Sequence, residues 1–411
     1  MVRRTKKAKQ TRQSKRQSRR LEPFDSFLDK LATDGQGRAP GKQAELTRIR
    51  AFLQNRYAGA VPVLSRIGHD GAIYDYFRIE DQPAARKQSL KPATPPPAGF
   101  LGVGQIGLQF RQQPEGAEDT TGLVPIRRLS VDDLRRVGSV DRFLHKRAKR
   151  LRSHLRSAEA AAAPGSLDPT HRWADVWGSF NNTGAAATLN IWRPELSGNQ
   201  LFSLSQIWCV AQGPNGRQTA EVGWHVNPSV TGHDQPAIFC YWTRDGYATP
   251  TSYNGHDSDF LFHGSNTVLG VPITDISDAG GDQFEVYCAL KLYNGNWWLY
   301  VGGDQESNAV GYFPGTLYNG GPLASGATEA DFGGEVCGGP PFAPMGSGAF
   351  SAAGSKQAAY QRNLGIWTAE GTLQNSLALH SEEADSASYT VSPANSSSWG
   401  NYFYFGGPGG N

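Results

Sequence analysis

The feature that most constrains the fold is the character of the chain beyond residue 170. There, short runs rich in Val, Ile, Tyr, Phe and Trp are separated by turn residues, and helical periodicity is nearly absent. Such runs are typical of strands, and they include 189–192, 203–212, 220–226, 237–243, 284–293, 296–303 and 310–314. Asn294-Gly295, between two of these runs, predicts a tight hairpin. We therefore expect an all-β sandwich or barrel of about 240 residues in one domain.

The part of the chain before residue 171 has a different charge. It holds 33 Lys and Arg against 17 Asp and Glu, whereas residues 171–411 hold 7 against 20. All ten Trp and all four Cys lie in the second part. Residues 1–20 carry ten basic residues, no acid and little apolar content, so we expect a disordered basic leader over 1–40. No secretory signal is visible, because acids rather than an apolar stretch follow Arg19-Arg20.

Between this leader and the β runs, the sequence predicts a small α+β region over 41–150. Apolar residues recur at helical spacing in 42–57, and 61–80 alternates around a Gly-containing turn like a hairpin. Ser130 with Asp133 predicts a capping box, and a second helix start follows at Ser139. A dense basic stretch covers 142–156, and Ala, Pro and Gly then predict an interdomain linker over 151–169.

Several classes of protein find no support in the motifs. No run of about 18 apolar residues is present, so we expect no membrane span. The nine His have no metal-ligand spacing, and neither C-x-x-C nor G-x-S-x-G occurs, so we expect no metal and no cofactor. The cysteines either are buried thiols or form disulfides in one of three pairings; they are Cys209, Cys240, Cys288 and Cys337.

Two glutamates stand out by their surroundings. Glu221 lies in an apolar run, and Glu335 lies between Gly-Gly and a valine. Burial of such a carboxyl group raises its pKa, and two facing carboxylates share one proton because two like charges at close range repel. One can then act as a base on water and the other as an acid. Spacing alone also allows both glutamates simply to face solvent.

Aromatic residues near these glutamates could line a groove. Alternate residues of a strand face one side, so Gln206 and Trp208 share a face. Trp is also common in the core of a large sandwich, which is the alternative for each of these residues. The candidate substrate-binding set is Gln206, Trp208, Trp224, Tyr241, Trp242 and Trp297.

At these residues the chain resembles the neprosin family of glutamic peptidases. The blocks that carry the resemblance include SQIWCV (205–210), AEVGWHVNP (220–228), FCYWTRDGY (239–247), FGGEV (332–336) and YFYFGGPG (402–409). In the N-terminal part, GHDGAIYDYFRIEDQPA (68–84) and GLVPIRRLSVDDL (122–134) are similar to the activation peptide of the family. The resemblance covers about residues 65–410 in one order of blocks.

The resemblance implies a two-sheet antiparallel β-sandwich over 170–411 with Glu221 and Glu335 as the catalytic dyad. It implies an acid-active endopeptidase that cleaves proline-containing peptides, typically after proline, and a secreted protein. We expect a monomer whose residues before about 165 form an inhibitory propeptide, held by its positive charge against the acidic catalytic domain, with no nucleic-acid partner. The alternative is a carbohydrate-active or carbohydrate-binding sandwich, because paired carboxylates and a Trp-lined groove also suit sugars.

Overall fold

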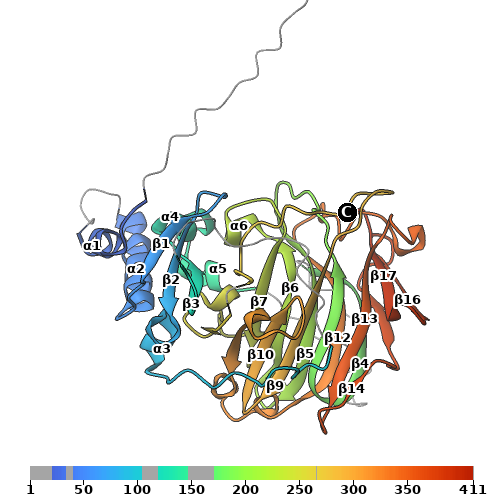
Figure 1. Ribbon diagram of the computed structural model, residues 1–411. Helices are drawn as coiled ribbons and strands as arrows, with labels where there is room; N and C mark the ends of the chain where they lie inside the picture. The colour runs from blue at the N-terminus through green and yellow to red at the C-terminus, as the bar shows by residue number, and fades with distance from the viewer. Residues whose placement is uncertain (1–20, 34–39, 104–118, 147–170, 265, 411) are drawn as a thin grey trace, which may run out of the picture.

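The computed structural model describes residues 21–33, 40–103, 119–146, 171–264 and 266–410 (Figure 1). We call the described residues before 147 the N-terminal region and those from 171 onward the β region. Residues 1–20 of the predicted leader and the whole predicted linker 151–169 lie outside the described residues. Within the described ranges, no helix is both long and apolar enough to cross a membrane.

The N-terminal region is a small α+β unit, as predicted. Its sheet has the order β1-β2-β3 and packs against helices (Figure 1). The predicted hairpin and the predicted capping box of α4 are both present. The elements are α1 (Phe24–Thr33), α2 (Pro40–Tyr57), β1 (Leu64–Ile67), β2 (Ile73–Arg78), α3 (Pro83–Gln88), β3 (Leu123–Arg127), α4 (Val131–Val137) and α5 (Val140–Leu144).

Helix α1 corrects the prediction of a disordered leader over 1–40. Its apolar residues recur at helical spacing, and Phe24, Phe27 and Leu31 are buried. The ring of Phe24 lies 5.5 Å from that of Tyr57 on α2, in an edge-to-face arrangement. The burial of these side chains against the rest of the N-terminal region offsets the entropy of ordering the segment.

The β region is an antiparallel sheet that folds over on itself. Hydrogen bonds join fourteen strands, and the main path runs β7-β6-β5-β12-β4-β9-β10-β11-β8. The helix α6 (Pro228–Thr231) follows β6. The strands are β4 (His171–Asn190), β5 (Gln200–Gly213), β6 (Gly216–Val226), β7 (Ala237–Thr243), β8 (Leu261–Phe262), β9 (Glu285–Tyr293), β10 (Asn296–Val301), β11 (Ala309–Pro314), β12 (Ala327–Gly338), β13 (Ala359–Thr368), β14 (Leu373–Gln374), β15 (His380–Glu383), β16 (Thr390–Ser396) and β17 (Gly400–Gly406).

The long strand β4 is the point at which the sheet folds over. Its first half pairs with β12 and β15, and its second half pairs with β9 and β13. The register slips near Asn182, whose side chain bonds the carbonyl of Phe180 and the N–H of Gly184. Such a bulge bends the strand, so β4 belongs to both layers. The result is the two-layer antiparallel sandwich that the sequence predicts.

Between the layers lies a continuous apolar core. Val222 of β6 and Ile207 of β5 belong to the same buried cluster as Leu290 of β9 and Leu299 of β10. The opposite side of β12, β5, β6 and β7 carries polar and aromatic side chains, and we call it the site face. Strand residues alternate between the two sides, so the register of these strands decides which side chains reach the site face.

Candidate active site

Register brings Glu221 and Glu335 to the site face on either side of β5. Glu221 on β6 lies opposite Trp208 of β5, and Glu335 on β12 lies opposite Leu204 of the same strand. Gln206 lies midway between these two β5 positions. Its neighbour on β6 is Gly223, where a Cβ would come within 2.6 Å of the Gln206 Cβ. The glycine therefore makes room for Gln206 between the two glutamates.

Glu221 is fully buried, and three neutral groups donate hydrogen bonds to its carboxylate. Its Oε1 accepts from the Tyr247 hydroxyl at 2.6 Å and from the Thr219 hydroxyl at 2.7 Å. Its Oε2 accepts from Nε2 of Gln206 at 3.2 Å. Burial, followed by the charge of Glu221, keeps the pKa of Tyr247 well above its usual value, so this phenol stays protonated as a donor.

Glu335 is also buried, but its neighbour is an imidazole. Nδ1 of His171, the first residue of β4, lies 2.7 Å from Glu335 Oε1. Burial on its own would lower the pKa of His171, but hydrogen bonds to Cys337 and Glu335 outweigh it and raise that pKa to about 10. At neutral pH His171 is therefore an imidazolium that donates its Nδ1–H to Glu335.

Lys146 of the N-terminal region joins the two glutamates. Its Nζ lies 2.6 Å from Glu221 Oε2 and 3.1 Å from Glu335 Oε2, and the Lys146 side chain is fully buried. It also donates to Oε1 of Gln206 at 3.2 Å. Burial favours the neutral amine, but the two carboxylates outweigh this effect and raise the pKa of Lys146. The two Oε2 atoms thus point to one shared position, which an ammonium group fills.

An aromatic wall surrounds that ammonium group. Lys146 Nζ lies 5.6 Å from the ring centre of Trp208, 5.8 Å from that of Tyr241 and 5.9 Å from that of Phe239. Cation–π attraction at this distance is strongest where water is excluded. The Tyr241 hydroxyl also contacts the backbone, because it accepts from the N–H of Lys146 and donates to the carbonyl of Leu144.

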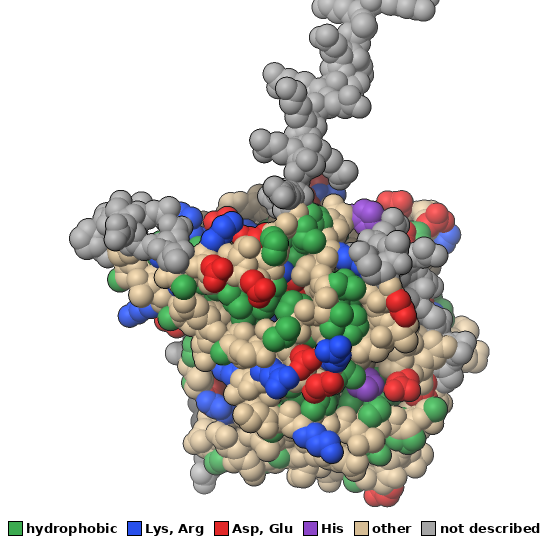
Figure 2. Space-filling view, turned by 60° about the vertical axis from the view of Figure 1, so that its left-hand side comes forward, with side chains coloured by type: hydrophobic (Ala, Val, Ile, Leu, Met, Phe, Trp, Pro, Cys, Tyr) green, Lys and Arg blue, Asp and Glu red, His purple; other side chains and the backbone are tan. Residues whose placement is uncertain are grey.

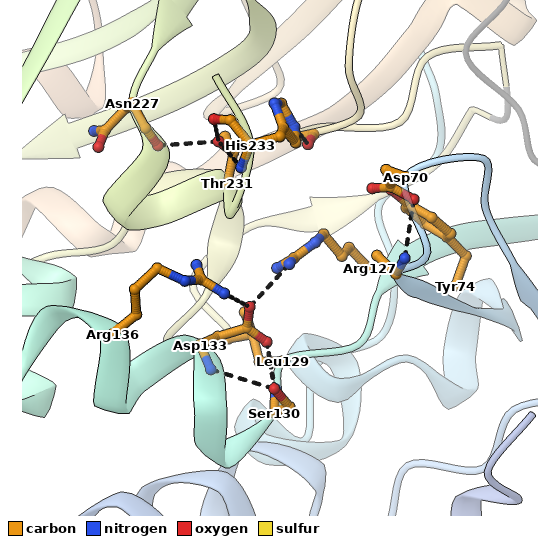
Figure 3. A network of polar contacts seen from close by, with 12 residues as sticks. Asp70, Tyr74, Arg127, Leu129, Ser130, Asp133, Arg136, Asn227, Thr231 and His233 are labelled. Atoms are coloured by element: carbon orange, nitrogen blue, oxygen red, sulfur yellow. Dashed lines mark hydrogen bonds and ion pairs between the residues drawn. The ribbon is translucent and has the colours of Figure 1, made fainter. Parts of the chain in front are cut away.

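A polar network fixes the helices that lead to Lys146. Asp133 closes the capping box of α4 with Ser130, and its carboxylate also accepts from Arg127 at 2.9 Å and from Arg136 at 3.0 Å (Figure 3). Burial would raise the pKa of Asp133, but Arg127 and the Ser130 bonds hold it well below its usual range. Helix α5 follows, and Nε2 of His145 then contacts the carbonyl of Tyr247 at 2.9 Å.

A cavity of about 180 Å³ opens beside Lys146. One side of it is lined by residues of the N-terminal region, including Arg136, Arg142 and Lys146. The other side is lined by the β region, including Phe202, Asn227 and Tyr253. The cavity therefore continues the site along the boundary between the two regions.

The predicted aromatic set divides between the two faces of the sheet. Gln206, Trp208 and Tyr241 lie on the site face, and their contact with substrate stays a prediction. Trp224, Trp242 and Trp297 belong to the core between the layers, so the prediction that they line the groove is wrong. The reason is the strand period of two. Trp224 is three residues from Glu221, and Trp242 directly follows Tyr241, so both point to the other side.

Each of these three buried indole N–H groups donates a hydrogen bond. Trp224 donates to the carbonyl of Asn190, Trp297 to that of Leu323, and Trp242 to the Asp259 carboxylate at 2.5 Å. Trp297 reaches the core from β10, which lies in the other layer. The side chains of these three residues therefore belong to the core between the layers.

Sequence reasoning missed the groups that contact the glutamates from elsewhere in the chain. Lys146 and His171 lie 75 and 164 residues from the glutamates that they contact most closely. No local motif marks either one. Tyr247 and Phe239 do carry a signal, because they lie in the same quoted block as Tyr241, and Phe239 shares its strand parity.

The cysteines are buried thiols, and no disulfide joins them. Burial raises the pKa of Cys209 and Cys288, which keeps both protonated. Cys337 differs, because its sulfur lies 3.3 Å from Nε2 of His171. In the described part of the chain, no cluster of three or more His, Cys, Asp or Glu side chains is placed to hold a metal ion.

Comparison with known proteins identifies the family. The Neprosin family model matches residues 199–408, just over half of the chain. By class the protein is a glutamic peptidase. The chain belongs to the Neprosin family, which confirms the resemblance recognised in the sequence.

Among solved structures, those of two peptidases are similar to this chain. One is scytalido-glutamic peptidase with a transition-state analogue inhibitor, at 11% identity and a TM-score of 0.34, covering 58% of this chain and 98% of that one. Another is SCP-B, a member of the eqolisin family, in a complex with the tripeptide Ala-Ile-His. It has 9% identity and a TM-score of 0.26, again covering 58% of this chain and 98% of that one.

Proposed function

We propose that the protein is an acid-active endopeptidase in which Glu221 and Glu335 together activate a water molecule. One observation carries the proposal: the Oε2 atoms of both buried glutamates converge on a single position. An ammonium group occupies it here. When Lys146 leaves, the same position suits a water that hydrogen-bonds to both carboxyl groups, of which one is ionised and the other protonated.

The reaction follows from that arrangement. The ionised carboxylate takes a proton from the water as the water oxygen bonds to the scissile carbonyl carbon. The protonated carboxyl group donates to the developing oxyanion and then gives its proton to the leaving nitrogen as the C–N bond breaks. Gln206, whose amide lies between the glutamates, supplies a further donor for the oxyanion.

We propose that the substrate presents proline beside this site, and that cleavage typically follows the proline. Support comes from the rings of Trp208, Tyr241 and Phe239, which surround the end of the Lys146 side chain. A proline ring is compact and apolar, and it packs well on aromatic faces. The core location of Trp224, Trp242 and Trp297 leaves few Trp residues for a sugar-binding groove, so we favour the peptide over the carbohydrate.

The zymogen is part of the same proposal. Lys146 cannot share its position with a catalytic water, so a chain with Lys146 in place is latent. We propose a prodomain that extends to about residue 150 and includes α1, a linker over 151–169 and a catalytic domain over 170–411. Processing within the linker would detach Lys146 from the catalytic domain. The intramolecular contacts of Lys146 suit a monomer, as the family resemblance implies.

The test is a digest of a protein mixture by the full chain over a series of pH values, with mass-spectrometric mapping of the cleavage sites. We expect cleavage after proline at acid pH, together with self-processing in the linker. Glu221→Gln and Glu335→Gln should each abolish both activities while circular dichroism stays unchanged. Glu195→Gln, at an exposed position, is the matched control and should remain active. Full activity of a folded Glu221→Gln or Glu335→Gln protein, or release of reducing sugar instead of peptides, would contradict the proposal.

A further inference from the structure

The Oε1 atoms of the two glutamates have chemically different hydrogen-bond partners. Oε1 of Glu335 faces the His171 imidazole, whereas Oε1 of Glu221 faces two hydroxyl groups, those of Tyr247 and Thr219. A hydroxyl group can turn and either donate or accept, so it tolerates both the ionised and the protonated carboxyl group. An imidazolium only donates, so it favours the ionised carboxylate alone.

His171 is fixed in place by its surroundings. Its ring stacks on Trp173 at 5.8 Å and 16°, and it meets the edge of Phe202 at 5.8 Å. Its other nitrogen lies 3.3 Å from the sulfur of Cys337. The imidazole therefore cannot turn away from Glu335 without losing these contacts. The ring is fully buried, so water does not screen its charge.

The charged groups around His171 come from several elements. Glu335 and Cys337 face it from β12, and the carbonyl of His171 itself accepts from the Arg172 side chain. Beyond Glu335 lies Lys146, which also bridges to Glu221 of β6. The contact between His171 and Glu335 does not involve Lys146, so it remains once Lys146 has left with the prodomain.

We propose that His171 is a positioning residue that decides which glutamate is ionised, so that Glu335 is the general base and Glu221 the general acid. The inference rests on the proposed function. Glu335 Oε2 takes the proton of the attacking water, and Glu221 gives its own proton to the leaving nitrogen. The cycle ends with Glu335 protonated and Glu221 ionised, and a proton transfer between the two Oε2 atoms restores the starting state.

Two variants separate this assignment from its reverse. His171→Gln removes the cation beside Glu335, and Tyr247→Phe removes one neutral donor to Glu221. Each change raises the pKa of the glutamate that it touches, because the ionised form loses support. A base must be ionised, so a higher pKa moves the acid limb of the pH profile to higher pH. An acid must be protonated, so a higher pKa moves the alkaline limb to higher pH.

The experiment measures kcat/KM against pH for a proline-containing peptide. Each full-length variant is first self-processed at acid pH, and rates are divided by the processed fraction seen on a gel. We expect His171→Gln to move the acid limb up by about 1 to 3 pH units, the range for a carboxylate that loses a neighbouring cation. Tyr247→Phe should move the alkaline limb by less. Shifts of the opposite limbs, or active variants with unchanged profiles, would overturn the assignment.

A measurement on the unaltered full chain protects the test against a variant that does not fold. Nitrogen-15 NMR of the His171 ring reports its protonation directly. We expect an imidazolium at pH 8, and a neutral ring at pH 7 would overturn the inference. Failure of the proposed function looks different, because the processed wild-type chain would then cleave no peptide at any pH while the His171 ring remained charged.

Discussion

The N-terminal region and the β region are held together in different ways. The β region is held together by long paired strands and by an apolar core. Strand β12, for example, pairs with β4 on one side and β5 on the other over most of its length. The N-terminal region also contributes apolar residues to that core, but its polar contacts with the β region are separate points. They include Lys146 at the glutamates, Lys87 on Asp257 and Gln82 on the backbone of Phe262.

The net charge of the described N-terminal region is small. The described N-terminal region has 16 Lys and Arg against 12 Asp and Glu, so most of the positive excess before residue 171 lies outside the described ranges. On the face shown in Figure 2, acidic and basic side chains lie interspersed. The buried pairs of Lys146 with Glu221 and Glu335 can be broken without separating any strands, whereas a shared sheet is held by many contacts at once. The predictions that follow test this contrast.

The largest effect is expected from Lys146→Met. The change leaves two buried carboxylates without their shared cation, and breaking a buried ion pair on one side costs about 3 to 5 kcal/mol. Hydrogen exchange of the α5 amides should then speed up by about two to nearly four orders of magnitude, at about tenfold per 1.4 kcal/mol. The control is Lys87→Met, which breaks a half-exposed pair with Asp257 and should cost at most about 1 kcal/mol. Equal effects of the two changes would contradict the contrast.

A somewhat smaller effect, confined to the N-terminal region, is expected from Arg128→Met. Arg128 pairs with buried Asp75 at 2.5 Å, donates to the carbonyl of Glu22 and lies over the rings of Phe24 and Phe27. All ten Trp lie in the β region. Urea should therefore unfold the N-terminal region earlier, seen by circular dichroism, while the Trp fluorescence transition stays in place. A joint shift of both signals would mean that the two regions unfold as one unit.

A moderate effect is expected from acid. His256 is stacked on Phe143 at 5.0 Å and 12°, and burial holds its pKa well below the usual range. Its neighbours include Arg56 and Arg127 of the N-terminal region. Because its pKa is lowered where the two regions are in contact, His256 favours that contact fully above pH 6.5. The contact becomes less stable as the pH falls below that value. The N-terminal region should therefore separate from the β region more often as the pH falls. The rate of proteolysis, which reports this separation, should rise by at most tenfold per pH unit for this one proton.

His256→Phe keeps a flat ring and removes the titration, so it should flatten that pH dependence. The exposed His380 provides the control, and His380→Gln should leave the dependence unchanged. An unaltered slope in His256→Phe would show that other groups, such as the glutamates around Lys146, carry the pH response.

The smallest effect is expected from Ser130→Ala. The change removes one half of the capping box of α4, and loss of an N-cap costs about 1 kcal/mol. Asp133 keeps its bonds to Arg127 and Arg136, so the helix itself should survive. Circular dichroism during urea unfolding should show the N-terminal transition shifted slightly. A loss as large as that of Arg128→Met would mean that the network around Asp133 depends on its cap.

Local patterns predicted much of the fold. Asn294-Gly295 forms the expected two-residue turn, with both residues at positive φ, because its flanking runs pair directly. Local patterns did not indicate the first part of β4, where Asn-Asn-Thr-Gly over 181–184 is typical of a turn. There β4 continues through a bulge, since strands on both sides hold it. A turn signal describes only a local preference, which the pairing of distant strands can override.

The candidate site was predictable where strand parity decides it. Gln206 and Trp208 follow from alternation once one of them is placed, because both lie on β5. Lys146 and His171 could not be found in this way, because their contacts with the glutamates depend on how separate segments meet. A lysine in a basic stretch ordinarily indicates a solvated surface. Its burial here depends on two carboxylates that only the complete fold brings together.

The strand β4 also sets the order in which the site can come into being. It begins the β region, yet its partners β9, β12, β13 and β15 end at residues 293, 338, 368 and 383. During synthesis β4 therefore remains unpaired until these later strands have left the ribosome. His171 is among the first residues of the β region to be made, and Glu335 comes 164 residues after it. The pair at the centre of the site can form only when most of the chain already exists.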